Sequence, residues 1–217
     1  MTVADDRRRL ADQLAAPAPL TDVHEFRPGP GVERLDLQFD PELLLAEWHA
    51  CRARLELSGE YTDHGFSGLA VTRRPGVAVP TSNDLSGRYW THGAVPADDP
   101  LVAHEDLVDE ADFAELHPDF AGTYFETVVD ALRERFTIGR VRLNVKSKWN
   151  CNSWHRDPEP RLHVPIVTDP GSLMIVDHHV THLPADGGVY FTDTRRWHTA
   201  LNGGQDDRVH LVAALVV

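Results

Sequence analysis

The sequence predicts a single domain, built mainly of β-strands with helices in its N-terminal half, that ends in a jelly-roll or sandwich barrel. A chain of 217 residues can bury one sizeable core, and single-domain barrels reach this length. After Gly139, short apolar runs alternate with turn-forming residues, which is typical of antiparallel β architectures. The first part, by contrast, contains stretches with helical periodicity. We expect a helical and loop-rich part over residues 1–137 and a barrel core over 138–217.

The N-terminal stretches predict a short helix, a strand and a longer helix, in that order. "ADDRRRLADQLAA" has amphipathic helical spacing and ends at Pro17. "RLDLQF" alternates apolar and polar residues like a strand. The following segment, "PELLLAEWHACRARLEL", begins with Pro41 behind Asp40. Aspartate is a favoured N-cap and proline fits the first helical turn, so we expect a helix to start here.

The middle third is the least informative part of the chain. Residues 57–118 are rich in Gly, Pro, Asp and Thr, and only "GLAVT" predicts a strand. The acid-rich stretch from Asp98 to Glu115 is expected to be a solvated face. "HPDFAGTYFETVVDALRERF" follows it and predicts a helix with one buried stripe. That stripe consists of Phe120, Tyr124, Val128, Leu132 and Phe136.

The C-terminal part predicts a series of short strands. They are expected in "RVRLNVKSKW", "RLHVPIVT", "SLMIVDHHV", "GVYFTD" and "RVHLVAALVV". Turn signals such as "DPEP", "DPG", "ADGG" and "NGGQDD" separate them.

Charge and cysteine content exclude several classes of function. The formal net charge is −13, and such a surface field disfavours nucleic acid as a partner. No apolar run approaches the length of a membrane span, and the first residues lack the apolar stretch of a signal peptide. Cys51 and Cys151 are too few and too far apart for a disulfide framework or a zinc ribbon. We expect a cytoplasmic protein without a membrane or nucleic-acid partner.

The segment "SWHRDPEPRLHVP" contains the strongest candidate for chemistry. His155 and Asp157 are separated by one residue, so in extended backbone both side chains leave the same face. His198, in "TRRWHTALN", is far enough along the chain to return on a neighbouring strand. Two imidazoles and one carboxylate on one side of a metal form the facial arrangement of non-haem Fe(II) oxygenases. With thirteen histidines in the chain, this spacing alone is weak evidence.

Cationic residues surround this motif in the sequence. Arg161, His163 and Arg208 fall on adjoining predicted strands. Inside a barrel they would need an anion to pair with. On the outside they would form an exposed ladder of salt bridges with the many acids. Judged on the residues alone, the two interpretations are equally good.

The stretch from Gly139 to Val217 resembles the aspartyl/asparaginyl β-hydroxylase family of iron- and 2-oxoglutarate-dependent dioxygenases, in particular its small bacterial proline-hydroxylase branch. The matching pieces are "GRVRLNV", "HRD", "RLHVPIVTD" and "GGVYFTDTRRWHTALNGGQDDRVHLV". The last piece is the most specific, because Asn202 and Arg208 follow His198 at the family's spacing. The likeness is strong over the last third of the chain and faint between Gly65 and Gly76.

The resemblance implies a double-stranded β-helix, a jelly-roll barrel of the cupin-like kind, that binds Fe(II) through His155, Asp157 and His198. It further implies that Arg208, assisted by Arg161 and His163, binds the distal carboxylate of 2-oxoglutarate. A carboxylate ligand favours hydroxylation over halogenation. The chain departs from the family before "HRD", where "KSKWNCNSWH" replaces a common Pro-Gly turn. The identity of the substrate is therefore not carried over.

The expected function is an Fe(II)/2-oxoglutarate-dependent dioxygenase that uses O2. It would hydroxylate an unactivated C–H bond of a free amino acid or similar small polar metabolite and convert 2-oxoglutarate to succinate. Two alternatives stay open. The same oxidant could give desaturation or cyclisation, or the domain could bind a metal or ligand in a cupin-like way without redox activity. The sequence gives no indication of the oligomeric state.

Substrate contacts can only be nominated from the sequence. "GLAVTRRPG" and "SGRYWTHG" occupy positions where the family would have a lid or pocket wall, and two further polar residues lie near the metal motif. Each has an equally good interpretation as an ordinary surface residue. The nominated residues are Arg73, Arg74, Trp90, His92, Asn152 and Arg195.

Overall fold

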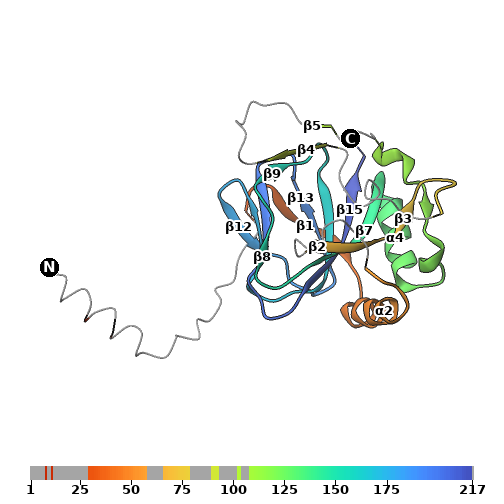
Figure 1. Ribbon diagram of the computed structural model, residues 1–217. Helices are drawn as coiled ribbons and strands as arrows, with labels where there is room; N and C mark the ends of the chain where they lie inside the picture. Colours follow the sequence, from red (N-terminus) through yellow and green to blue (C-terminus); the bar gives the residue numbers. More distant parts are fainter. Residues whose placement is uncertain are drawn as a thin grey trace.

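The computed structural model shows a β-barrel with two long helices packed on one of its sheets (Figure 1). It describes residues 8, 11, 29–57, 66–78, 89–92, 102–103 and 108–216, and side chains are not described at residues 66, 89–92 and 102–103. The expected helix over residues 4–16 lies outside this part, apart from helical backbone at Arg8 and Ala11. In the described part, no helix is long and apolar enough to cross a membrane.

The first sheet has six strands in the order β1-β13-β10-β15-β7-β2, and every described pairing in it is antiparallel. Its strands are β1 (Val32–Gln38), β2 (Phe66–Ala70), β7 (Ile138–Lys146), β10 (Arg161–Val167), β13 (Gly188–Thr192) and β15 (Arg208–Leu215).

The second sheet has the order β12-β11-β14-β9-β4-β5, and β8 also pairs with β14. Its strands are β4 (Tyr89–His92), β5 (Val102–Ala103), β8 (Asn150–Cys151), β9 (His155–Arg156), β11 (Ser172–Val176), β12 (His179–His182) and β14 (His198–Asn202). A separate pair, β3 (Thr72–Arg73) and β6 (Glu115–Leu116), lies beside β7.

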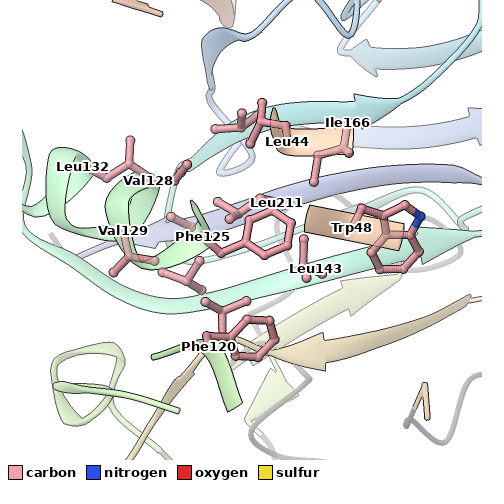
Figure 2. Close-up of a cluster of buried hydrophobic side chains, with 14 of the residues drawn as sticks. Leu44, Trp48, Phe120, Phe125, Val128, Val129, Leu132, Leu143, Ile166 and Leu211 are labelled. Carbon is pink, nitrogen blue, oxygen red and sulfur yellow. The ribbon is translucent and has the colours of Figure 1, made fainter. Parts of the chain in front are cut away.

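Two α-helices cover one face of the first sheet and form the apolar core with it. They are α2 (Pro41–Arg54) and α4 (Tyr124–Arg135), with short 3-10 turns η2 (Glu110–Asp112) and η3 (Pro118–Phe120) before α4. Helix side chains meet the apolar side chains of β7, β10 and β15 in one cluster (Figure 2). The cluster includes Leu44, Trp48, Phe120, Phe125, Val128, Val129, Leu132, Leu143, Ile166 and Leu211.

The opposite face of the first sheet is polar, although it is buried. Since successive side chains of a strand point to opposite faces, the residues between the core positions point away from the helices. On β7, β10 and β15 these residues are Arg140, Arg142, Asn144, Lys146, Arg161, His163, Arg208 and His210. All except Arg161 are buried. An ordinary sandwich would place apolar residues here, so this interior is built to hold charge.

The sequence-based strand and helix predictions are largely confirmed, with two corrections. The helix predicted within residues 117–136 starts only at Tyr124, because Pro118 opens a 3-10 turn and Gly122 adopts a φ of +76°, which ordinary residues avoid. The single strand predicted in "SLMIVDHHV" is wrong. Asp177, at φ 52°, turns the chain so that β11 and β12 form a hairpin.

Replacing the N-cap of α2 should destabilise the protein measurably. Asp40 Oδ1 accepts hydrogen bonds from the backbone N–H groups of Glu42 and Leu43, at 2.9 and 3.2 Å. Asp40→Ala removes these acceptors, and loss of such a cap costs about 1 kcal/mol. Urea unfolding at neutral pH should show the loss, whereas Asp40→Asn should largely retain stability. Equal stability of Asp40→Ala and wild type would contradict the capping role.

Candidate metal centre

Three side chains of the second sheet and its adjoining loop converge on one point inside the barrel. His155 and His198 are directly opposite each other on the paired strands β9 and β14. Asp157 follows β9, and its backbone N–H donates to the carbonyl of Thr194 at 2.9 Å. One ligand atom from each residue lies within 4.8 Å of the others. The three residues predicted from the sequence are therefore brought together.

The backbone orients both imidazoles so that Nε2 is the nitrogen available to a ligand. His155 Nδ1 donates to the carbonyl of Ser153 at 2.7 Å, and His198 Nδ1 donates to the carbonyl of Arg196 at 3.1 Å. A carbonyl oxygen only accepts, so in the neutral ring Nδ1 carries the proton and Nε2 presents a lone pair. Metal-binding histidines are commonly oriented in this way.

The charge states of these residues also suit a metal ion. Burial acts to raise the pKa of Asp157, but Arg161 and the nearby histidines hold it below its usual value. Burial lowers the pKa of His198 to about 4. The site thus presents a carboxylate and a neutral imidazole at neutral pH, which are the states that metals bind. His198 Nε2 and Asp157 Oδ2 are 3.4 Å apart. Two adjacent ligand atoms that are each bonded to a metal at about 2.1 Å lie about 3 Å apart, so the observed distance is close to that of a metal site. The donor set fits Fe(II).

Arg208 opens β15 on the polar interior face and is buried. Its Nε has no hydrogen-bond partner, and within the described ranges no carboxylate forms an ion pair with it. Burial lowers the pKa of Arg208 to about 10, which still leaves it charged at neutral pH. A buried charge without a counter-charge is costly, so this guanidinium marks a position for an anion.

Two buried histidines lie on the same face as Arg208. His163 Nδ1 and His210 Nδ1 are 3.2 Å apart, and the Nε2 of each has no hydrogen-bond partner. Burial, followed by the charge of Arg208, lowers the pKa of both well below the usual range. Both rings are therefore neutral at pH 7, with one Nδ1 donating to the other. Each free Nε2 can hydrogen-bond a ligand.

Lys146 lies directly opposite Arg208 on the paired strand β7. Its ammonium group donates to Asn150 Oδ1 at 3.3 Å and to Asn152 Oδ1. Burial and the neighbouring Arg208 lower the pKa of Lys146 to about 7. A carboxylate bound beside these two cations would favour the charged form of the lysine.

A second group of charges lies near the triad. Arg161 forms an ion pair with Asp157 at 2.9 Å, and Arg140 forms one with Glu110 at 2.6 Å. Glu159 is buried close to these charges; burial and then Glu110 raise its pKa. In the strand register, Arg161 is opposite Ala214, about 20 Å along β15 from Arg208 at about 3.3 Å per residue. The structure therefore places Arg161 with Asp157 and does not bring it beside Arg208.

The nominated substrate residues lie in several different places. Arg73 pairs with Glu115 at 3.0 Å, and Arg195, half-exposed, pairs with Asp193 at 2.7 Å. Asn152 accepts from Lys146. Arg74 has an interaction partner.

Trp90 and His92 belong to β4, where the backbone of His92 is opposite His155. Their side chains are outside the described part. The segment "SGRYWTHG", which was expected to form a lid or pocket wall, thus contains a strand that lies beside β9 (Figure 1).

The buried neutral histidines predict that the ligand-free protein loses stability in mild acid. The pKa values of His163 and His210 are lowered in the folded protein, whereas unfolded histidine titrates near 6.5. Below about pH 6.5 the unfolded chain therefore binds protons that the folded chain does not. The free energy of unfolding consequently decreases as the pH is lowered. Urea unfolding at pH 7.5 and 5.5 measures the fall. His210→Leu should make it smaller, and a pH-independent stability would contradict this reasoning.

Comparison with known proteins supports the fold. No family model matches the chain, and neither does any curated protein. A solved "Oxidoreductase, 2OG-Fe(II) oxygenase family" from Burkholderia pseudomallei is similar over 85% of this chain and 83% of its own, with 16% identity and a TM-score of 0.50. This chain has the double-stranded β-helix fold. A Pseudomonas putida prolyl-4-hydroxylase is similar over 86% of this chain and 93% of its own, at 12% identity and a TM-score of 0.47, too distant to add to the assignment.

Sequence reasoning missed more than half of the basic residues and histidines on the interior face of this double-stranded β-helix. Arg140, Arg142, Lys146 and His210 were not nominated, although they alternate with apolar residues in "GRVRLNVK" and "RVHLV". Alternation of this kind usually predicts a solvent-exposed face. The closed barrel that the sequence predicts would cover the inner face of these strands, and this was the signal that could have indicated their burial.

Proposed function

We propose that this protein is an Fe(II)- and 2-oxoglutarate-dependent dioxygenase. The observation that carries the proposal is the pairing of a metal-competent His-Asp-His triad with a buried, unpartnered arginine on the facing wall of the same barrel. The triad can hold the metal on one side and leave other positions open. The arginine offers a planar pair of donors for a carboxylate.

In this proposal His155, Asp157 and His198 hold Fe(II), which, with dioxygen and 2-oxoglutarate bound, supplies the oxidising chemistry and yields succinate. Arg208 binds the distal carboxylate of 2-oxoglutarate. His163 and His210 hydrogen-bond the co-substrate between the metal and Arg208, and Lys146 adds a second positive charge beside that carboxylate. Arg161, which was expected to assist Arg208, instead holds the Asp157 carboxylate in place.

The reaction we propose is hydroxylation of a free amino acid or similar small polar metabolite at an unactivated C–H bond, in the cytoplasm. A barrel interior lined with charge suits a polar substrate better than an apolar one. Desaturation or cyclisation of the same substrate is the second candidate, because all three outcomes begin with removal of hydrogen. Product mass separates them: hydroxylation adds one oxygen, and the alternatives lose two hydrogens.

Succinate release tests the proposal. The purified protein is incubated with Fe(II), ascorbate, 2-oxoglutarate and each member of an amino-acid panel, and succinate and product mass are measured. Substrate-stimulated succinate release is the expected result. Failure to bind 2-oxoglutarate, or binding of metal and ligand with no succinate release under any condition, would favour a cupin-like binding domain without redox activity.

A further inference from the structure

Glu159 is a buried acid whose Oε2 atom has no hydrogen-bond partner. The residue is 5% exposed. An ionised carboxylate in such a position is unfavourable unless something supplies a donor or a positive charge. Buried polar atoms are nearly always satisfied in folded proteins, so an exception calls for an explanation such as strain, a catalytic role, or a bound water or ion.

The backbone around Glu159 is fixed by two prolines and two hydrogen bonds. Pro158 and Pro160 flank the residue and restrict φ on both sides. Thr194 Oγ1 donates to the carbonyl of Glu159 at 2.6 Å, and the carbonyl of Pro160 accepts from the backbone N–H of Leu215 at 3.0 Å. The backbone of Glu159 is therefore held at a buried position of the barrel.

The surroundings of Glu159 place it at the metal end of the barrel. It interacts electrostatically with Glu110, Arg161, Asp157 and Arg140. Glu110 has Arg140 as its partner, and Asp157 has Arg161. Of these three acids, Glu159 is the one without an ion-pair partner among the described residues.

We propose that Glu159 determines specificity by binding a protonated amine of the primary substrate. The assignment rests on the proposed function, which puts the reacting carbon near the metal. An ammonium group supplies the donor that Oε2 lacks and forms an ion pair with the carboxylate. A second metal ion would need further ligands, and the triad is the only cluster of potential metal ligands in the part of the chain that the structure describes. The substrate class is therefore a small molecule with a free amino group.

Calorimetry on inert, loaded protein tests the assignment without turnover. The wild-type protein is loaded with Mn(II) and 2-oxoglutarate, whose binding is measured first. It is then titrated with the twenty common L-amino acids and with the N-acetyl derivative of each. At least one free amino acid should bind, and its N-acetyl form should bind at least tenfold more weakly. If no member binds, or if acetylation leaves affinity unchanged, the assignment is overturned.

Glu159→Gln provides the second arm, with Glu134→Gln on the exposed face of α4 as a matched control. Glu159→Gln should weaken binding of the amine-bearing ligand at least tenfold, leave 2-oxoglutarate affinity within twofold, and leave Tm unchanged or higher. Glu134→Gln should change none of these. A lower Tm with unchanged amine affinity would show a structural role and overturn the proposal. Failure of wild type to bind 2-oxoglutarate would overturn the proposed function and this assignment with it.

Discussion

Replacing His155 and Asp157 together with alanine should abolish Fe(II) binding and succinate release. One imidazole would then remain of the three converging ligands, too few to hold a divalent ion in a defined geometry. Metal content after anaerobic loading and the rate of succinate release are the measurements. His178→Ala, at an exposed histidine, should leave both unchanged. Activity that survived the double replacement would exclude this triad as the metal site.

A second variant separates loss of ligands from loss of folding. Removing Asp157 also leaves Arg161 without its ion-pair partner, and breaking a buried pair in this way costs about 3–5 kcal/mol. His155→Ala combined with His198→Ala retains that pair and should still fold. It should nevertheless lose the metal. If this double variant folded and still kept its iron, the metal would have to bind elsewhere.

Replacing Arg208 should have opposite effects on co-substrate binding and on stability. Arg208→Gln should weaken 2-oxoglutarate binding by about 2–5 kcal/mol, a factor of roughly 30 to several thousand. Arg208→Lys should recover part of the affinity, because it restores charge but not the planar pair of donors. Meanwhile Arg208→Met should raise the free energy of unfolding of the ligand-free protein, since it removes a buried cation without a counter-charge.

Calorimetry with Mn(II)-loaded protein and urea unfolding of the ligand-free protein measure these two effects. Arg34→Gln is the matched control, because Arg34 is exposed and pairs with Asp186 at 2.5 Å. It should change neither quantity appreciably. If Arg208→Met destabilised the ligand-free protein while 2-oxoglutarate affinity stayed the same, Arg208 would be a structural residue.

The sequence predicted those features that depend on local pattern. The Asp40 cap and Pro41 located the start of α2, and one-residue spacing put His155 and Asp157 on one side of the chain. Features that depend on long-range register were not predictable. Nothing local shows that Arg161 lies opposite Ala214, and so far from Arg208, because the alignment of β10 with β15 is set by the assembled sheet.

The charged interior shows a second limit of sequence reasoning. An alternating strand such as "GRVRLNVK" normally has one wet face, so Arg140 and Arg142 carry no local sign of burial. Glu159 is similar, because a glutamate between two prolines is typical of an exposed turn. The closed barrel buries all three. The burial of these residues is recognised only when the facing sheet is in place.

Anaerobic titration with Fe(II) and then 2-oxoglutarate tests whether the metal and the co-substrate bind together at this centre. We expect a visible charge-transfer band that appears only when both are present, saturates at one equivalent of iron per chain, and is lost in the variant with His155→Ala and His198→Ala. Arg208→Gln should require a much higher concentration of 2-oxoglutarate to give the same band. Absence of the band in wild-type protein, with iron and 2-oxoglutarate in excess, would contradict the proposed function.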